Sequence, residues 1–121
     1  MIQITPYGFS TFLKAMTGKV KRMHLFVENG ELSGHGYMPI EIMPDNWDNG
    51  RYPEQTWEFE AGEPADVMGY YTTDASGQIL FTEMFETRNE MNEVVPAPAR
   101  IKNNGDRISV AINLNMLGAP A

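Results

Sequence analysis

Few residues in this 121-residue chain could do acid–base or metal chemistry. It has two histidines, His24 and His35, and no cysteine. Two histidines fall short of a typical zinc ligand set unless carboxylates complete it. Because His24 lies in an alternating segment and His35 lies between glycines, we interpret both as ordinary strand and turn residues. The absence of cysteine excludes disulfides and thiol nucleophiles. We therefore expect no metal site.

Carboxylates are abundant, with 16 Asp and Glu residues. Glu58 and Glu60 lie two residues apart, on one face of an expected strand. A glycosidase needs two carboxylates that face each other across a cleft, one of them with a raised pKa. Residues 45–50, DNWDNG, offer oxygen ligands beside a glycine, but they lack the ligand spacing of a calcium loop. We interpret that segment as a polar turn and keep a small carboxylate-dependent hydrolase as an alternative.

Three motifs that carry nucleophilic or phosphate chemistry are missing from the sequence. It contains no G-x-S-x-G, no G-x-G-x-x-G and no G-x-x-x-x-G-K-[ST]. The backbone arrangements for a serine nucleophile, a dinucleotide and a nucleoside triphosphate are therefore not indicated. We expect no catalytic residue and no cofactor, and we predict that the protein is not an enzyme.

Aromatic residues in a polar segment are the better candidates for contacts. Residues 44–55 read as a long polar loop, broken by prolines and a glycine, that contains Trp47, Arg51 and Tyr52. Aromatic residues and arginine are enriched at interface hot spots, and aromatic rings also stack on sugars. Trp47 folding back over the end of the domain is an equally good interpretation. Trp57 alternates within a strand pattern, so we place it in the core.

The N-terminal segment, residues 1–19, carries a short helical pattern. Ser10 is the predicted N-cap and Gly18 the predicted C-terminal glycine. A helix this short needs to dock its apolar face, on its own domain or on a neighbouring subunit. That face repeats at the spacing of one helical side and consists of Phe9, Phe12, Leu13 and Met16.

Residues 20–121 read as short strands separated by turns. Glu28-Asn29-Gly30 and Asp74–Gly77 are hairpin signals, and Pro39 marks an edge strand or a bulge. Two long loops are expected near 44–55 and 86–100. The nine methionines fall mostly at apolar positions and are expected to fill the core. The pattern predicts one mainly β domain, an antiparallel β-sandwich with a short N-terminal α-helix; an open β-barrel is the second choice.

The charge is distributed unevenly along the chain. Residues 1–22 hold four basic residues and no acidic one, whereas residues 23–93 hold 15 acidic and two basic residues. The net charge of −7 argues against a nucleic-acid partner, because phosphates are bound by lysine and arginine. No apolar run approaches the roughly 20 residues of a membrane span, and no secretory signal is visible, so we expect no membrane partner.

The order of the later motifs resembles a group of small virion proteins of tailed bacteriophages. The segments LFVENG, GYMPIEIMPDNW and TWEFE precede the most specific parts, which are Gly69–Phe85 (GYYTTDASGQILFTEMF) and residues 105–110 (GDRISV). The resemblance spans about residues 9–116, and only Thr87–Ala99 departs from it, being longer and more acidic. It implies a non-enzymatic structural role and a location in the virion.

The resemblance and the composition together give a functional expectation. We expect a capsid decoration (cement) protein that binds the lattice of the major capsid protein as a trimer or dimer and stabilises the head. A subunit associated with the tail, baseplate or fibre, and a glycan- or receptor-binding module, are the alternatives. The residues expected to contact the partner are Phe9, Phe12, Leu13, Met16, Trp47, Arg51 and Tyr52.

Overall fold

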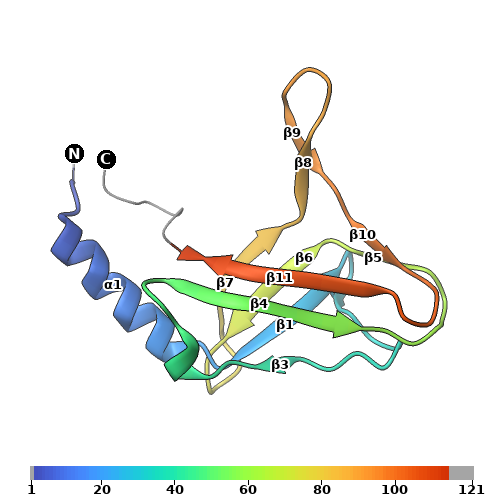
Figure 1. Ribbon diagram of the computed structural model, residues 1–121, viewed down its shortest axis with the longest axis horizontal. Helices are drawn as coiled ribbons and strands as arrows, with labels where there is room; N and C mark the ends of the chain where they lie inside the picture. Colours follow the sequence, from blue (N-terminus) through green and yellow to red (C-terminus); the bar gives the residue numbers. More distant parts are fainter. Residues whose placement is uncertain (1, 115–121) are drawn as a thin grey trace.

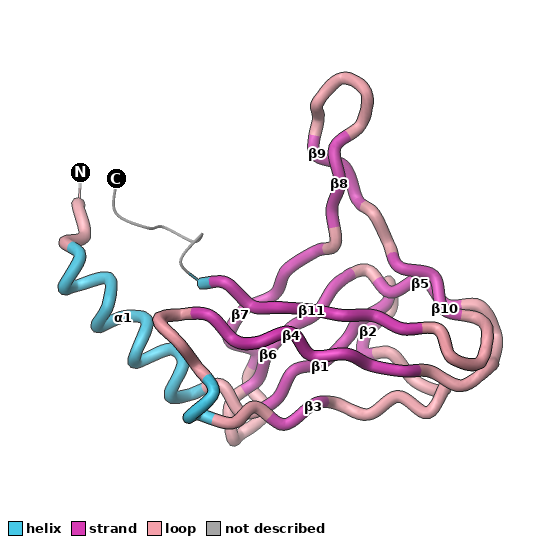
Figure 2. The backbone as a smooth tube through the Cα atoms, viewed as in Figure 1, coloured by secondary structure: helices cyan, strands magenta, loops and turns pink. Residues whose placement is uncertain are grey.

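The computed structural model describes residues 2–114 and shows a mainly β fold with one N-terminal helix (Figure 1). The helix lies across one end of the strands (Figure 2). The elements in chain order are α1 (Pro6–Lys19), β1 (Arg22–Val27), β2 (Gly30–Glu31), β3 (Ile40–Glu41), the 3-10 turn η1 (Pro44–Asn46), β4 (Arg51–Glu58), β5 (Ala65–Val67), β6 (Gly69–Thr73), β7 (Ile79–Met84), β8 (Glu86–Arg88), β9 (Val94–Pro96), β10 (Ala99–Ile101) and β11 (Arg107–Asn113).

Helix α1 begins earlier and ends later than its sequence signals indicated. Thr5 is the N-cap, and its hydroxyl oxygen accepts a hydrogen bond from the backbone N–H of Gly8 at 3.0 Å. Pro6 follows at the first helical position, where a missing N–H costs nothing. The prediction of Ser10 as the cap was therefore wrong. Gly18 lies inside the helix, which continues to Lys19.

The larger sheet is antiparallel and has the order β2-β1-β6-β7, with β3 also pairing with β1. The expected hairpin after β1 is confirmed, since Val27 pairs with Gly30 across Glu28 and Asn29. The hairpin between β6 and β7 is confirmed as well, with a register shift between Thr72 and Thr73. No described strand pairs with the outer edge of β7, so this sheet ends in an open strand of six residues.

A second pair of strands, β4 and β11, covers the inner face of that sheet. The buried side chains of β11 alternate as expected, at Ile108, Val110 and Ile112. They pack with Trp57 and Tyr52 of β4 against residues of the larger sheet that include Met23, Leu25 and Tyr70. The described residues thus form layered, separate antiparallel sheets, a sandwich-like arrangement that does not close into a barrel.

The stretch expected as a long loop near 86–100 is instead largely strand. β8 and β9 form a hairpin that projects away from the body (Figures 1 and 2), and β10 then pairs with β5. Asn89 shapes the tip: its side-chain oxygen accepts hydrogen bonds from the N–H groups of Met91 and Glu93. The sequence signal failed here because prolines and acidic residues suppressed the alternating pattern.

Two further expectations are corrected by the structure. The loop predicted over residues 44–55 is shorter, because strand β4 already begins at Arg51. The methionines do not all fill the core. Met23 is buried, but four others are exposed: Met38, Met43, Met84 and Met91. Met116 lies outside the described residues.

Candidate functional site

An apolar groove separates helix α1 from strand β7. It has a volume of about 320 Å³ and an almost wholly apolar wall. Phe12 is the most exposed aromatic side chain of that wall, with 63% of its surface accessible. Leu13, the next residue along the helix, is buried. The lining residues are Phe9, Phe12, Leu13, Ala15, Met16, Leu80, Phe81 and Leu114.

All four residues predicted on the helix face line this groove. Helical spacing found them because a repeat of three and four residues selects one side of a helix. The opposite wall, Leu80 and Phe81, was missed. These side chains follow each other along β7, and both are only half buried because the strand is at the edge. A signal existed in the run Ile79-Leu80-Phe81, which has apolar side chains on both faces of a strand.

A second hollow lies next to the groove along β7. It has a volume of about 160 Å³ and lies between β7 and the end of β11. Phe81 and Leu114 line both hollows, so the two are adjacent. In its wall, the hydroxyl of Tyr70 hydrogen-bonds Glu83, and burial followed by this bond raises the pKa of Tyr70. The open strand β7 is therefore flanked by apolar surface at Leu80 and Phe81 and by a mixed polar and apolar hollow at Thr82 and Glu83.

The three residues predicted in the polar loop do not form one exposed surface. Tyr52 is only 3% exposed, because the alternation of β4 turns it into the core, so its prediction as a contact residue was wrong. Its hydroxyl accepts the backbone N–H of Met43 at 2.9 Å. Trp47 is half buried and packs edge-on against Tyr52, with ring centroids 5.0 Å apart. Arg51 is exposed at the start of β4.

Trp47 nevertheless lies near the helix. It lines a small polar hollow together with Leu13 and Lys14 of α1. Its indole N–H is buried and has no hydrogen-bond partner among the described residues. The structure thus places Trp47 beside the helix, in a hollow that shares Leu13 with the apolar groove. This position supports the interpretation that Trp47 covers the end of the domain.

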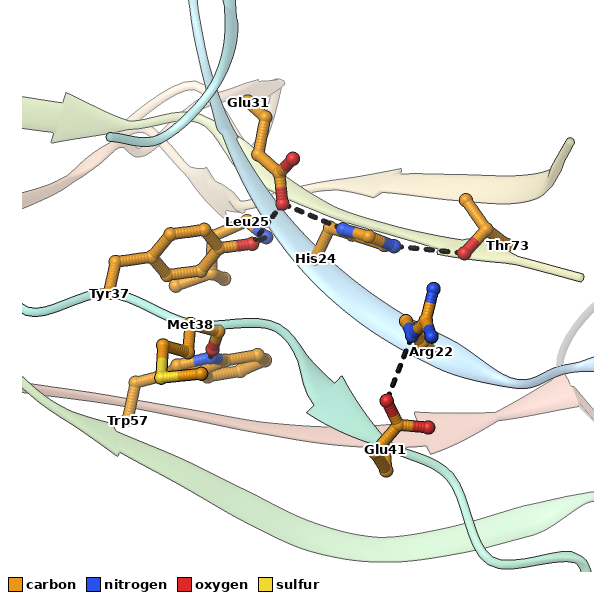
Figure 3. A network of polar contacts seen from close by, with 9 residues as sticks. All are labelled: Arg22, His24, Leu25, Glu31, Tyr37, Met38, Glu41, Trp57 and Thr73. Atoms are coloured by element: carbon orange, nitrogen blue, oxygen red, sulfur yellow. Dashed lines mark hydrogen bonds and ion pairs between the residues drawn. The ribbon is translucent and has the colours of Figure 1, made fainter. Parts of the chain in front are cut away.

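A polar network crosses the outer face of the larger sheet (Figure 3). His24 of β1 is at its centre. Its Nδ1 lies 2.7 Å from Glu31 Oε2, and its Nε2 lies 2.9 Å from the Thr73 hydroxyl. The Tyr37 hydroxyl donates to the same Glu31 oxygen at 2.6 Å and accepts the N–H of Leu25 at 3.0 Å. The His24 ring also stacks on Tyr71 at 4.6 Å.

The network shifts the pKa of its carboxylate and phenols. Burial acts to raise the pKa of Glu31, but hydrogen bonds from Tyr37 and His24 outweigh it, so the pKa is lowered. Burial and then the bond to Glu31 raise the pKa of Tyr37. Burial, reinforced by the nearby charge of Glu31, also raises the pKa of Tyr71. Glu31 is consequently held as a carboxylate that accepts hydrogen bonds.

The order carboxylate, imidazole, hydroxyl is also that of a nucleophile relay. The Thr73 hydroxyl is poorly placed for that chemistry, since Thr73 is only 4% exposed within the sheet. The bonds instead join β1, β2, β6 and the segment of Tyr37. Sequence reasoning missed this cluster, although the predicted hairpin pairs Phe26 with Glu31 and so makes His24 a diagonal neighbour of Glu31.

The other candidate residues for chemistry have structural roles. His35 has a φ of 57° in its turn, and its two ring nitrogens lie 2.9 and 2.7 Å from the carbonyl oxygens of Glu60 and Glu63. Glu58 is exposed and pairs with Arg107 across β4 and β11 at 3.3 Å. Within residues 2–114, no three His, Asp or Glu residues gather in a way that could hold a metal ion. No helix in the described part of the chain is long and apolar enough to cross a membrane.

Comparison of the chain with protein-family models, with curated proteins and with solved structures finds no match.

Proposed function

We propose that this chain is a non-enzymatic structural protein of a bacteriophage virion, where it decorates the capsid by binding the lattice of the major capsid protein. The observation that supports this proposal most is the apolar groove between α1 and β7, with Phe12 exposed on its rim. Exposed apolar surface of this kind marks sites of protein association. The resemblance of Gly69–Phe85 and residues 105–110 to phage virion proteins supplies the setting.

The geometry favours attachment over the two other classes of function. A glycan platform would need exposed rings, but Tyr52 is buried and Trp47 is half buried. A carboxylate hydrolase would need two acids facing each other in a cleft, but Glu58 is exposed and paired with Arg107. By contrast, the groove and the projecting β8–β9 hairpin are both suited to contacts between proteins.

The test has a binding arm and a counting arm. Purified protein is mixed with phage heads that lack it, and bound protein is measured by sedimentation. Saturable binding, with heads that release their DNA at a higher temperature, is expected, since a ligand of the assembled state stabilises that state. Quantitative mass spectrometry of intact virions should give a copy number comparable with the major capsid protein. Roughly twelve copies or fewer would indicate a tail subunit instead.

A further inference from the structure

We propose that the β8–β9 hairpin of one copy docks into the groove between α1 and β7 of a second copy. This inference deepens the proposed function, on which its biological meaning rests. Its physical basis is independent of the virion, because it depends only on two surfaces of this chain.

The hairpin is a preformed and uncovered element. In Figures 1 and 2 it projects away from the sheets and from α1, and the main contacts of β8 and β9 are with each other. A lone two-stranded hairpin is marginally stable in water. Its exposed apolar side chains include Met91, 79% exposed at the tip, and Val94, 52% exposed. Covering these groups by a partner would bury apolar surface without unfolding the tip.

The tip is ordered by its own hydrogen bonds. Arg88 donates to the carbonyl oxygen of Asn92 at 2.8 Å, and Asn92 has the left-handed φ of 61° that closes the turn. The side-chain oxygen of Asn89 accepts two backbone N–H groups. Because the conformation exists before contact, docking loses little chain entropy.

The groove offers what an extended apolar segment needs. The outer edge of β7 has no partner strand among the described residues, so its backbone groups can pair with an added strand. Apolar side chains line both sides of that edge: Phe12 on the helix, Phe81 on the strand, and Ile79 at its exposed start. Strand addition supplies the backbone bonds, and the groove accepts alternate side chains.

Charge favours the hairpin as the occupant. Between Glu86 and Pro96 the hairpin carries three acidic residues and one basic residue. Helix α1 carries two basic residues, Lys14 and Lys19, and no acidic one. A second copy therefore brings negative charge to a positive helix, which steers the encounter and fixes its direction. The contact joins two different surfaces, so two copies exchange it reciprocally in a two-fold dimer, or it repeats head-to-tail as a ring or a filament.

The test uses two variants that each remove one surface. Phe12→Glu places a charge on the groove rim, and Met91→Glu places one on the hairpin tip. Met38→Glu is the matched control, because Met38 is 73% exposed and lines neither hollow beside β7. Sedimentation velocity over a range of concentrations should show association of the wild type. Phe12→Glu and Met91→Glu should each weaken it by about ten-fold or more, and Met38→Glu should leave it unchanged.

Mixing the two variants distinguishes this contact from others. Phe12→Glu keeps an intact hairpin and Met91→Glu keeps an intact groove, so their mixture should form a pair that neither forms alone. A wild type that stays monomeric at all concentrations would overturn the proposal, as would association that both variants leave untouched. Absence from virions with normal self-association would remove only the proposed function. Head binding by a protein that never self-associates would remove only this inference.

Discussion

The carboxylate of Glu31 links its own strand, β2, to strand β1 and to the segment of Tyr37. It accepts a hydrogen bond from Tyr37 and lies 2.7 Å from the ring of His24, which in turn contacts Thr73. Charged acceptors make stronger hydrogen bonds than neutral ones, and several donors on one carboxylate favour its ionised form. The consequence is a residue whose contribution to stability depends on pH.

Glu31→Gln should therefore destabilise the protein at pH 5 and much less at pH 2.5. The folded-state pKa of Glu31 is lowered, while the unfolded value is about 4.3. The stabilisation is fully present above the unfolded value and is lost as the pH falls through the folded one. We expect a loss of about 1 kcal/mol at pH 5 by urea unfolding. Glu28→Gln, in the exposed turn of the same hairpin, is the control and should show no such pH-dependent loss.

Gly69 tests the close pairing of β6 and β7. A Cβ at this position would overlap the carbonyl oxygen of Glu83 and lie 3.0 Å from the Met84 Cα. Because backbone atoms cannot move aside cheaply, Gly69→Ala should cost about 1–3 kcal/mol in the free energy of unfolding. Gly18→Ala is the matched control, since nothing lies within 4 Å of its added methyl inside α1. It should be neutral or stabilising by up to about 1 kcal/mol.

At the scale of elements, the N-cap of α1 stabilises the helix that forms one wall of the groove. Thr5→Ala removes the acceptor of the Gly8 N–H and should destabilise the helix by about 1 kcal/mol. Amide hydrogen exchange in the first turn of α1 that is faster than in the wild type would show this destabilisation. Thr11→Ala is the comparison in the same helix, because the Thr11 hydroxyl only bonds back to the carbonyl of Tyr7. Equal losses in the two variants would contradict the assigned cap.

Sequence patterns predicted the elements whose signal is local. The alternation of β11 placed Ile108, Val110 and Ile112 in the core, and helical spacing placed Phe9, Phe12, Leu13 and Met16 on one face. Partners distant along the chain left no such signal. The far wall of the groove, Leu80 and Phe81, depends on which strand lies at the sheet edge, and the Thr73 contact of His24 joins residues 49 apart.

The projecting hairpin matters at the scale of the whole molecule, since it adds surface without adding core. Of residues 87–95, only Val95 is even partly buried. Thr87 and Val95 are cross-strand partners, so a two-residue Asn-Gly turn can join them in place of residues 88–94. Such a shortened chain should keep its free energy of unfolding within about 0.5 kcal/mol, because exposed residues contribute little to stability.

Urea unfolding of the shortened chain and the wild type measures this difference, and Trp57→Ala gives the scale of a true core loss, about 3–5 kcal/mol. A drop of that size on shortening would mean that the hairpin stabilises its own copy. If the shortened chain keeps its free energy of unfolding but no longer self-associates, the hairpin does not stabilise its own copy. The hairpin is then kept for contacts between copies, and the same deletion separates folding from assembly in one molecule.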